Sequence, residues 1–200
     1  MTIERKVQLV EKLFDQLEKE SLQFSRVSGI HCVSGCGKCC TYPDVSASPL
    51  EFLPWAFHLF LNGKAVEMHT ALGENRDITC RLFTPLSLLG DGHCSNYKYR
   101  GLICRLFGFA ANRDKYGQLR LATCKIIKEQ QANSYRNVSE AIARGLYVPV
   151  FTDYYMQLNQ IDFQLGNKLL PINKALKMAL EEVLQYYAYR PLPDAEIECV

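Results

Sequence analysis

The stretch that decides this fold is Cys32-Val-Ser-Gly-Cys36-Gly-Lys-Cys39-Cys40, which holds four of the nine cysteines of the chain. Thiolates two or three residues apart can converge on one metal ion or cluster without closure of a long loop. Gly35 and Gly37 permit backbone conformations that bring N–H groups toward sulfur and offset its negative charge. Free cysteines buried in a core would be scattered, so the clustering predicts a metal-binding loop.

Four more cysteines follow this loop at wider spacing. The start of the chain lacks the apolar stretch of a secretory signal, and residues 50–61 are too short to span a bilayer. We therefore expect a cytoplasmic protein with no membrane partner, in which structural disulfides are not expected. The expected metal ligands are Cys32, Cys36, Cys39, Cys40, Cys80, Cys94, Cys104 and Cys124. Cys199 lies outside the pattern and is expected to be a free thiol.

Composition sets the remaining bounds. Hydrophobic residues make up 48% of the 200 residues, enough for a core that does not depend on metal alone. The net charge of +2 gives no general argument for a nucleic-acid or membrane partner. Residues 94–128 are locally basic, and this leaves a nucleic-acid module using Tyr97, Tyr99, Phe107 and Phe109 as an alternative.

The rest of the chain is predominantly helical by pattern. An apolar stripe at helical spacing predicts a helix over residues 2–27, capped by Thr2 and ended near Gly29. Ser48-Pro-Leu-Glu51 is a capping box that begins a helix ending near Asn62-Gly63. Further helices are expected over residues 64–75, 125–133, 138–146, 153–164 and 171–188.

The expected β structure is small. Residues 78–83 alternate weakly and predict a short strand, and residues 106–123 predict a hairpin that turns at Asp114–Gly117. We therefore expect a mostly α fold with a small β hairpin and cysteine loops packed between helices. The expected divisions are an N-terminal amphipathic helix (1–29), a metal-binding domain (30–130) and a C-terminal helical segment (131–200).

The second set of cysteines carries a resemblance to a known family. Cys36, Cys39 and Cys40 match the end of a CxxCxxCC signature. The later block is matched by Cys94, Tyr97, Arg100, Cys104, Arg105 and Phe107, and its last cysteine by Cys124. Over roughly residues 30–130 the sequence resembles the YkgJ-type cysteine-cluster family, described as a zinc- or iron-chelating domain. The gap from Cys32 to Cys36 is one residue longer than in that family, and Gly101 stands where the family has proline.

The longer gap also matches the cysteine spacing of radical S-adenosylmethionine enzymes. Those enzymes need a barrel of alternating strands and helices, which this sequence does not predict. Arg100, Arg105 and Tyr97, which lie in the family block, are expected around the bound group. Tyr97 is expected in the core with its hydroxyl near the site, and Arg105 is expected to donate to a sulfur or to a neighbouring carbonyl oxygen. His31 and His93 adjoin cysteines but are expected to be ordinary surface or core histidines.

All-cysteine sites suit both zinc and iron–sulfur clusters. One tight loop with dispersed partners favours an iron–sulfur cluster, of the 4Fe-4S type, with structural zinc as the alternative. A redox or methyl-transfer enzyme that uses the cluster is a further alternative. The sequence identifies no protein partner and no catalytic residue.

Overall fold

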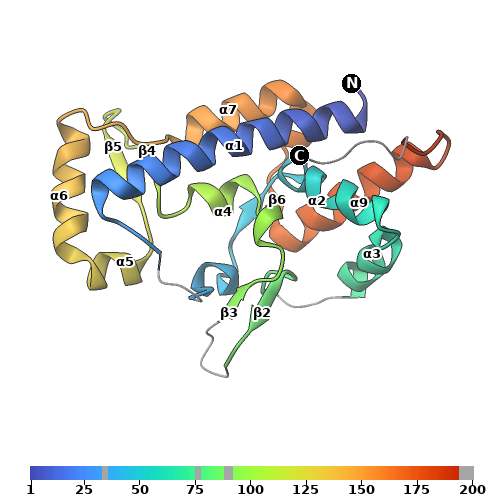
Figure 1. Cartoon of the computed structure of the whole chain (residues 1–200), viewed down its shortest axis with the longest axis horizontal. Coiled ribbons are helices and arrows are strands. Elements are labelled where there is room, and N and C mark those ends of the chain that lie inside the picture. The colour runs from blue at the N-terminus through green and yellow to red at the C-terminus, as the bar shows by residue number, and fades with distance from the viewer. Residues whose placement is uncertain (33–35, 75–77, 88–91, 194–200) are drawn as a thin grey trace.

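The computed structural model describes residues 1–32, 36–74, 78–87 and 92–193. Helix α1 (Ile3–Ser28) runs along one side of the molecule, with α7 (Phe151–Ile161) beside it (Figure 1). The Thr2 hydroxyl accepts the Arg5 N–H at 3.3 Å, and Gly29 ends the helix at φ 69°. Both end signals of α1 were therefore predicted correctly.

One hydrophobic core lies around the N-terminal half of α1. It is built by η2 (Pro49–Phe52), α2 (Leu53–Leu61), α3 (Ala65–Glu74) and α9 (Ile172–Tyr187), with Trp55 fully buried. The predicted capping box is present at Ser48, with proline at the first helical position. Its helix begins as a 3-10 turn, and Pro54 lies at the start of the α-helical part.

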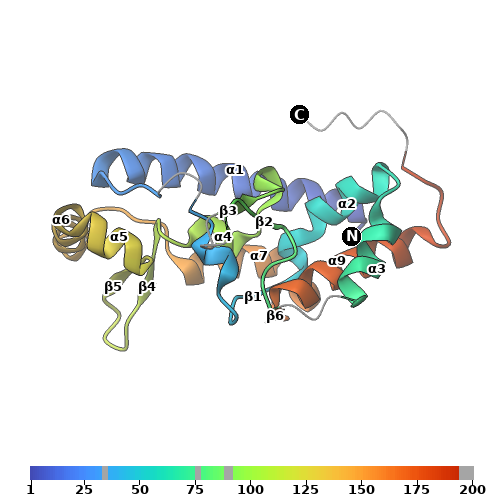
Figure 2. The ribbon, with the colours of Figure 1, turned by 90° about the horizontal axis from the view of Figure 1, so that it is seen from below.

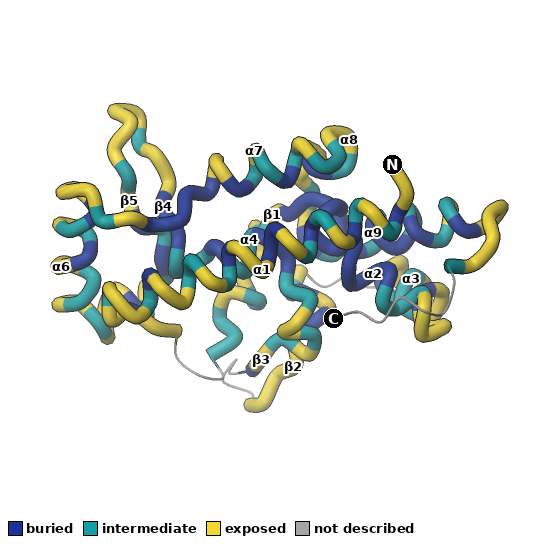
Figure 3. The backbone as a smooth tube through the Cα atoms, turned by 45° about the horizontal axis from the view of Figure 1, so that its top comes forward, coloured by how far each residue is buried: buried dark blue, intermediate teal, exposed yellow. Residues whose placement is uncertain are grey.

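A second, smaller core lies at the other end of α1 (Figure 2). It is built by α5 (Lys125–Gln130), α6 (Ala132–Ala143) and the hairpin of β4 (Ala110–Arg113) and β5 (Leu119–Ala122). Phe24 of α1 and Ile30 just beyond it are buried in this core. The predicted hairpin is confirmed, and its exposed tip stands away from the body (Figure 3).

The segments that carry cysteines lie between these two cores, on one side of α1 (Figure 1). Cysteines lie in η1 (Lys38–Thr41), β3 (Gly92–Cys94) and α4 (Leu102–Leu106), and β2 (Phe83–Pro85) and η3 (Tyr97–Tyr99) adjoin them. The remaining described elements are β1 (Ser46–Ala47), its antiparallel partner β6 (Leu170–Pro171), and α8 (Phe163–Gly166). The mostly α class with small β hairpins is confirmed.

Several predicted boundaries were wrong. Residues 78–82 form no strand, and β2 begins at Phe83 and pairs antiparallel with β3, a hairpin that was not predicted. α6 begins at Ala132 rather than near residue 138. Pro171 precedes α9 and belongs to β6, where it pairs with Ser46. Cys199, which is expected to be a free thiol, lies outside the described residues.

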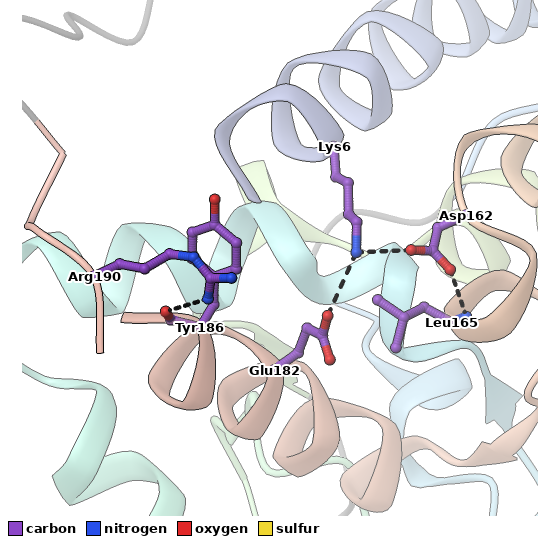
Figure 4. A network of polar contacts seen from close by, with 6 residues as sticks. All are labelled: Lys6, Asp162, Leu165, Glu182, Tyr186 and Arg190. Atoms are coloured by element: carbon purple, nitrogen blue, oxygen red, sulfur yellow. Dashed lines mark hydrogen bonds and ion pairs between the residues drawn. The ribbon is translucent and has the colours of Figure 1, made fainter. Parts of the chain in front are cut away.

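A polar network joins the first helix to the last two (Figure 4). The Lys6 ammonium lies 2.7 Å from Asp162 and 3.4 Å from Glu182, and these side chains are largely shielded from solvent. Asp162 also accepts the Leu165 N–H at 3.0 Å and so caps α8. At the end of α9, Arg190 stacks on Tyr186 and donates to its carbonyl oxygen. Because Lys6 contacts α8 and α9 together, it fixes the N-terminal half of α1 against both.

Among the described residues, none of the helices combines the length and the apolar character needed to cross a bilayer.

Candidate metal centre

The eight described cysteines come from five stretches of the chain, namely residues 32–40 and the surroundings of Cys80, Cys94, Cys104 and Cys124. Cys32 and Cys36 flank the undescribed residues 33–35, Cys39 and Cys40 lie in η1, and Cys80 precedes the β2–β3 hairpin. Cys94 ends β3, Cys104 lies in α4, and Cys124 is the N-cap of α5. Cys80 is buried, Cys32 and Cys39 are exposed, and the others are half-buried.

Backbone contacts hold η1 against the β2–β3 hairpin. The Cys80 N–H donates to the Cys40 carbonyl oxygen at 3.1 Å, and the Phe83 N–H donates to the Cys80 carbonyl oxygen at 2.9 Å. Phe83 then pairs with Cys94 across the hairpin. Gly37 has φ +56°, and a Cβ there would lie 2.6 Å from the Gly92 carbonyl oxygen. Glycine is therefore required where η1 approaches the hairpin this closely.

A second set of contacts fixes Cys32 beside α5. The Gln131 side chain accepts the His31 N–H at 3.1 Å and donates to the His31 carbonyl oxygen at 2.7 Å. Gln131 follows directly on α5, whose N-cap is Cys124, and the Cys124 sulfur accepts the Ile127 N–H at 3.4 Å. One glutamine thus ties the residue before Cys32 to the helix that begins at Cys124.

The eight thiols form one electrostatic neighbourhood. Burial raises the pKa of Cys80 to about 11, and burial also raises the pKa of Cys94 and Cys104, with further increases from neighbouring cysteines. Desolvation raises the pKa of Cys32, and the charges of Cys39, Cys36 and Cys124 add to it. Thiols whose charges act on one another in this way favour a bound cation that stabilises their deprotonated forms.

Adjacent Cys39 and Cys40 behave as a pair. The Cys40 thiol donates a hydrogen bond to Cys39, which lowers the pKa of Cys39 to about 6 and raises that of Cys40. Backbone N–H groups of Leu82 and Phe83 support the Cys80 sulfur, and that of Asn96 supports Cys94. Such N–H donors offset negative charge on metal-bound thiolates.

The donor set fits a thiophilic metal by chemistry, since thiolates select zinc, copper(I) and iron–sulfur clusters. The side chains themselves stand further apart than ligands of one ion do. Within residues 1–32, 36–74, 78–87 and 92–193, no three His, Cys, Asp or Glu side chains converge closely enough to hold a metal ion. The fold brings the cysteine segments into one region, and a bound metal would draw their sulfurs together.

One buried polar residue, Glu51, positions α4, which carries Cys104. The Glu51 carboxylate, 1% exposed, accepts the Ser48 N–H at 2.7 Å, the Ile103 N–H at 2.9 Å and the Tyr155 hydroxyl at 3.1 Å. Burial raises the pKa of Glu51. The sequence had marked Glu51 only as a helix cap. Its link to Ile103, 52 residues away, has no local sequence signal.

Arg105 does not donate to a sulfur. Its guanidinium donates to the carbonyl oxygens of Lys98 and Arg100 and to the Glu18 carboxylate, and it lies 4.6 Å from the Phe14 ring centroid. It therefore fixes the 98–100 segment against α1. Of the two contacts predicted for Arg105, the one to a neighbouring carbonyl oxygen is present, and it supports the backbone near the cysteines.

Arg100, which stacks on Tyr97, lies near three of the thiols. The Arg100 guanidinium stacks 3.6 Å from the Tyr97 ring centroid, and its charge acts on Cys32, Cys39 and Cys94. Tyr97 is 63% exposed, so the prediction that it lies in the core was wrong; Arg100 covers one ring face instead. Both residues line a groove of about 550 Å³ whose opposite wall is the acidic face of α1.

The other sequence candidates lie away from this region or on the surface. His31 and His93 are both exposed. Of the basic residues between 94 and 128, Lys98, Arg113, Lys115, Arg120, Lys125 and Lys128 are exposed. Arg120 and Lys125 form ion pairs with Asp114 and Glu129, respectively, and this reduces the net charge of that face.

Comparison with known proteins agrees with the cysteine pattern. The family model CxxCxxCC, described as "Putative zinc- or iron-chelating domain", matches residues 31–136, just over half of the chain. This protein therefore belongs to the CxxCxxCC family, and metal chelation is the function that the family assignment supports. No curated protein and no solved structure matches the chain.

Proposed function

We propose that this protein binds an iron–sulfur cluster through its cysteine thiolates, with the ligands drawn from Cys32, Cys36, Cys39, Cys40, Cys80, Cys94, Cys104 and Cys124. The supporting observation is that eight thiols from five segments share one neighbourhood between the two cores. Four-thiolate sets are the usual ligands of [4Fe–4S] clusters, which supply electron transfer or bind substrate at iron.

Iron–sulfur is favoured over zinc by how the cysteines are distributed. A zinc ribbon presents two Cys-x-x-Cys turns, whereas this chain has one such spacing, Cys36–Cys39, and single cysteines elsewhere. Arg100 and the N–H groups of Leu82, Phe83 and Asn96 lie where they offset thiolate charge. These donors would stabilise the negative charge on the sulfurs that bind an iron–sulfur cluster.

The test is anaerobic purification from an iron-replete host, followed by iron, sulfide and zinc analysis and visible absorption. We expect iron with acid-labile sulfide and a brown protein. Cys39→Ser and Cys104→Ser should lose the metal, while the matched control Cys199→Ser, outside the family pattern, should retain it. Colourless protein with stoichiometric zinc would contradict the cluster and support the zinc alternative, and equal metal content in all three variants would contradict the ligand assignment.

The groove favours a second candidate, a cluster-dependent redox or methyl-transfer enzyme. The groove is lined by residues of α1 and by Arg100, whose charge acts on Cys39, so a molecule bound there would contact a residue that is electrostatically coupled to the thiols. A redox enzyme requires a metal centre whose reduction potential allows it to accept an electron from a reductant such as dithionite. Anaerobic titration with dithionite, followed by electron paramagnetic resonance, tests this requirement, and a spectrum that never changes would remove the redox candidate.

A further inference from the structure

Positive charge is concentrated at the end of the molecule that holds the smaller core. Residues 106–146 carry seven basic and three acidic side chains, a net charge of +4, whereas the whole chain carries +2. The rest of the chain is therefore net acidic. The ten charged side chains of this stretch lie on the β4–β5 hairpin and on or beside α5 and α6. A charge separated in this way attracts anions to one end of the molecule.

Ion pairs within this stretch neutralise only part of its positive charge. Each of its three carboxylates is paired with a different base at 3.1–3.8 Å, in the pairs Asp114–Arg120, Glu129–Lys125 and Glu140–Arg144. In the part of the chain that the structure describes, no carboxylate oxygen lies within 4.0 Å of the other four bases, which are all exposed: Arg113, Lys115, Lys128 and Arg136. These four cations can bind an external anion without loss of an internal ion pair.

Two of these four bases, Lys128 and Arg136, line a groove of about 440 Å³ between strand β5 and helices α5 and α6. The same basic groove is lined by Arg120 of β5 and by Tyr135 of α6. The Lys128 ammonium lies 5.5 Å from the centroid of the Tyr135 ring. Tyr135 is half-buried and packs against the smaller core, so its ring is held in place with cations around it.

The β4–β5 hairpin extends the positive charge beyond the basic groove. Its tip stands away from the body (Figure 3) and carries Arg113, Lys115 and the exposed Tyr116. The Lys115 ammonium lies 4.9 Å from the centroid of the Tyr116 ring. Strand β5, which forms one wall of the groove, has four residues and therefore spans roughly 13 Å. A ligand that contacts both the groove and the tip is therefore extended and carries several negative charges.

The chemistry of the surface favours one kind of polyanion. Binding to an anionic membrane requires apolar side chains that insert, yet Tyr116 is the only exposed large hydrophobic residue within the described stretch 106–146. An acidic protein segment supplies carboxylates but no flat ring for Tyr135. A single strand of nucleic acid supplies both, since its phosphates bind cations and its unpaired bases stack on aromatic rings.

We propose that the basic groove binds single-stranded nucleic acid, with Lys128, Arg136 and the hairpin tip on phosphates and one base against Tyr135. The aromatic residues that the sequence suggested for a nucleic-acid module lie elsewhere. Tyr97 and Tyr99 line the groove beside α1, and Phe109 packs against the smaller core. None of the residues that line the basic groove is a candidate metal ligand, so its occupant is bound independently of the metal.

The test measures binding of fluorescein-labelled oligo(U) and oligo(dT) to the full chain, purified anaerobically, by fluorescence anisotropy. About four phosphate contacts to a single strand, each contributing about −0.7 to the slope of log affinity against log salt, predict a slope near −2.8. Affinity should therefore fall about 50-fold between about 50 and about 200 mM salt. Binding of either strand supports the proposal, and the tighter of the two identifies the sugar. Absence of saturable binding of both strands at about 50 mM salt overturns it.

Charge variants locate the site. Lys128→Gln combined with Arg136→Gln should weaken binding by at least about 10-fold and roughly halve the salt slope, because two of the four phosphate contacts are lost. The matched control combines Lys168→Gln with Lys174→Gln, two exposed lysines of the other end of the molecule, and changes the net charge by the same amount. It should bind like the wild type. Equal weakening in the two double variants overturns the assignment to the basic groove.

A ring variant separates a nucleic acid from any other polyanion. Tyr135→Leu keeps an apolar side chain against the smaller core but removes the stacking surface, so it should weaken binding about 10-fold and leave the salt slope unchanged. Wild-type affinity in folded Tyr135→Leu, or equally tight binding of a labelled oligoglutamate, overturns the proposal because neither involves a stacked base. Since Lys128 and Arg136 are exposed, their double variant decides the matter if Tyr135→Leu does not fold.

Discussion

Glu51 is the buried residue whose removal should disturb this architecture most. Its carboxylate is the acceptor for three donors from different elements: the Ser48 N–H, the Ile103 N–H and the Tyr155 hydroxyl. Glu51→Ala leaves all three without an acceptor in a site that is 1% exposed. Each unsatisfied buried donor costs roughly 1–3 kcal/mol, so we expect a loss of at least ~3 kcal/mol in the free energy of unfolding. For a chain of this size that corresponds to a fall in Tm of about 6–12 °C.

Two matched variants separate the contributions of the individual donors to this loss in the free energy of unfolding. Glu51→Gln keeps one oxygen for two of the donors but must turn its amide N–H₂ toward the third, so its loss should be intermediate. Tyr155→Phe removes a donor without leaving one unsatisfied, so it should cost only about 1 kcal/mol. Urea unfolding of metal-free, reduced protein measures all three, since metal loss then contributes nothing. If Glu51→Ala unfolds at the wild-type urea midpoint, the carboxylate does not hold α4 in place.

Three further predictions follow from contacts elsewhere in the chain. Burial raises the pKa of Asp162, but its hydrogen bond and charge interaction with Lys6 more than offset this, so its pKa lies below the usual value of 3.8. The ion pair stabilises the fold above pH 3.8, and this stabilisation is lost as the pH falls through the lowered pKa of Asp162. Asp162→Asn should therefore cost about 1–2 kcal/mol at pH 7 and progressively less as the pH falls below 3.8, and a cost that does not fall with pH would refute the ion pair. Gly37→Ala should lower metal content sharply because its Cβ would strike the hairpin, whereas Gly63→Ala, with φ +69° and open space around it, should leave metal content unchanged; equal metal content in the two variants would show that the close approach is unimportant. Arg105→Ala should speed chelator-driven metal loss by about 10-fold, with Arg105→Lys intermediate because lysine lacks the planar fork, and three identical loss curves would exclude a supporting role.

Local signals made most of the helical fold predictable. Thr2 and Gly29 bound α1, the Ser48 capping box begins the next helix, and Gly63 takes the left-handed conformation at its end. The hairpin that turns at Asp114–Gly117 was likewise found from its turn residues. These features depend on residues a few positions apart, so one sequence contains all the information needed to predict them.

The parts that were missed depend on distant contacts. Cys80 and Leu82 are buried although they lie in a turn, so the alternation of buried and exposed side chains there resembled that of a strand. The strand that does form is β2, which pairs with β3 and has Pro85 opposite Gly92. A Cβ on Gly92 would lie 2.4 Å from the Thr84 carbonyl oxygen, and no local pattern announces this. Gly101, which replaces the family proline, begins α4 at φ −62°, an angle that proline also adopts. A Cβ there would lie 2.8 Å from the Phe52 ring, a contact that only the tertiary structure defines.

The sequence predicted which cysteines are candidate ligands but not how they are arranged in space. The spacing of Cys36, Cys39 and Cys40 identified thiol ligands and the family, but not which distant cysteines they approach. Their positions depend on the packing of the two cores and on Gln131, which holds His31 from 100 residues away. A glutamine between two helices carries no sequence signal for such a role.

X-ray absorption at the metal K-edge tests most directly whether cysteine sulfurs hold the metal. For wild-type protein purified anaerobically, we predict a first coordination shell made of sulfur, at about 2.3 Å for zinc or for an iron–sulfur cluster. A first shell dominated by nitrogen or oxygen scatterers would contradict it, because the thiols of this region would then not be the ligands.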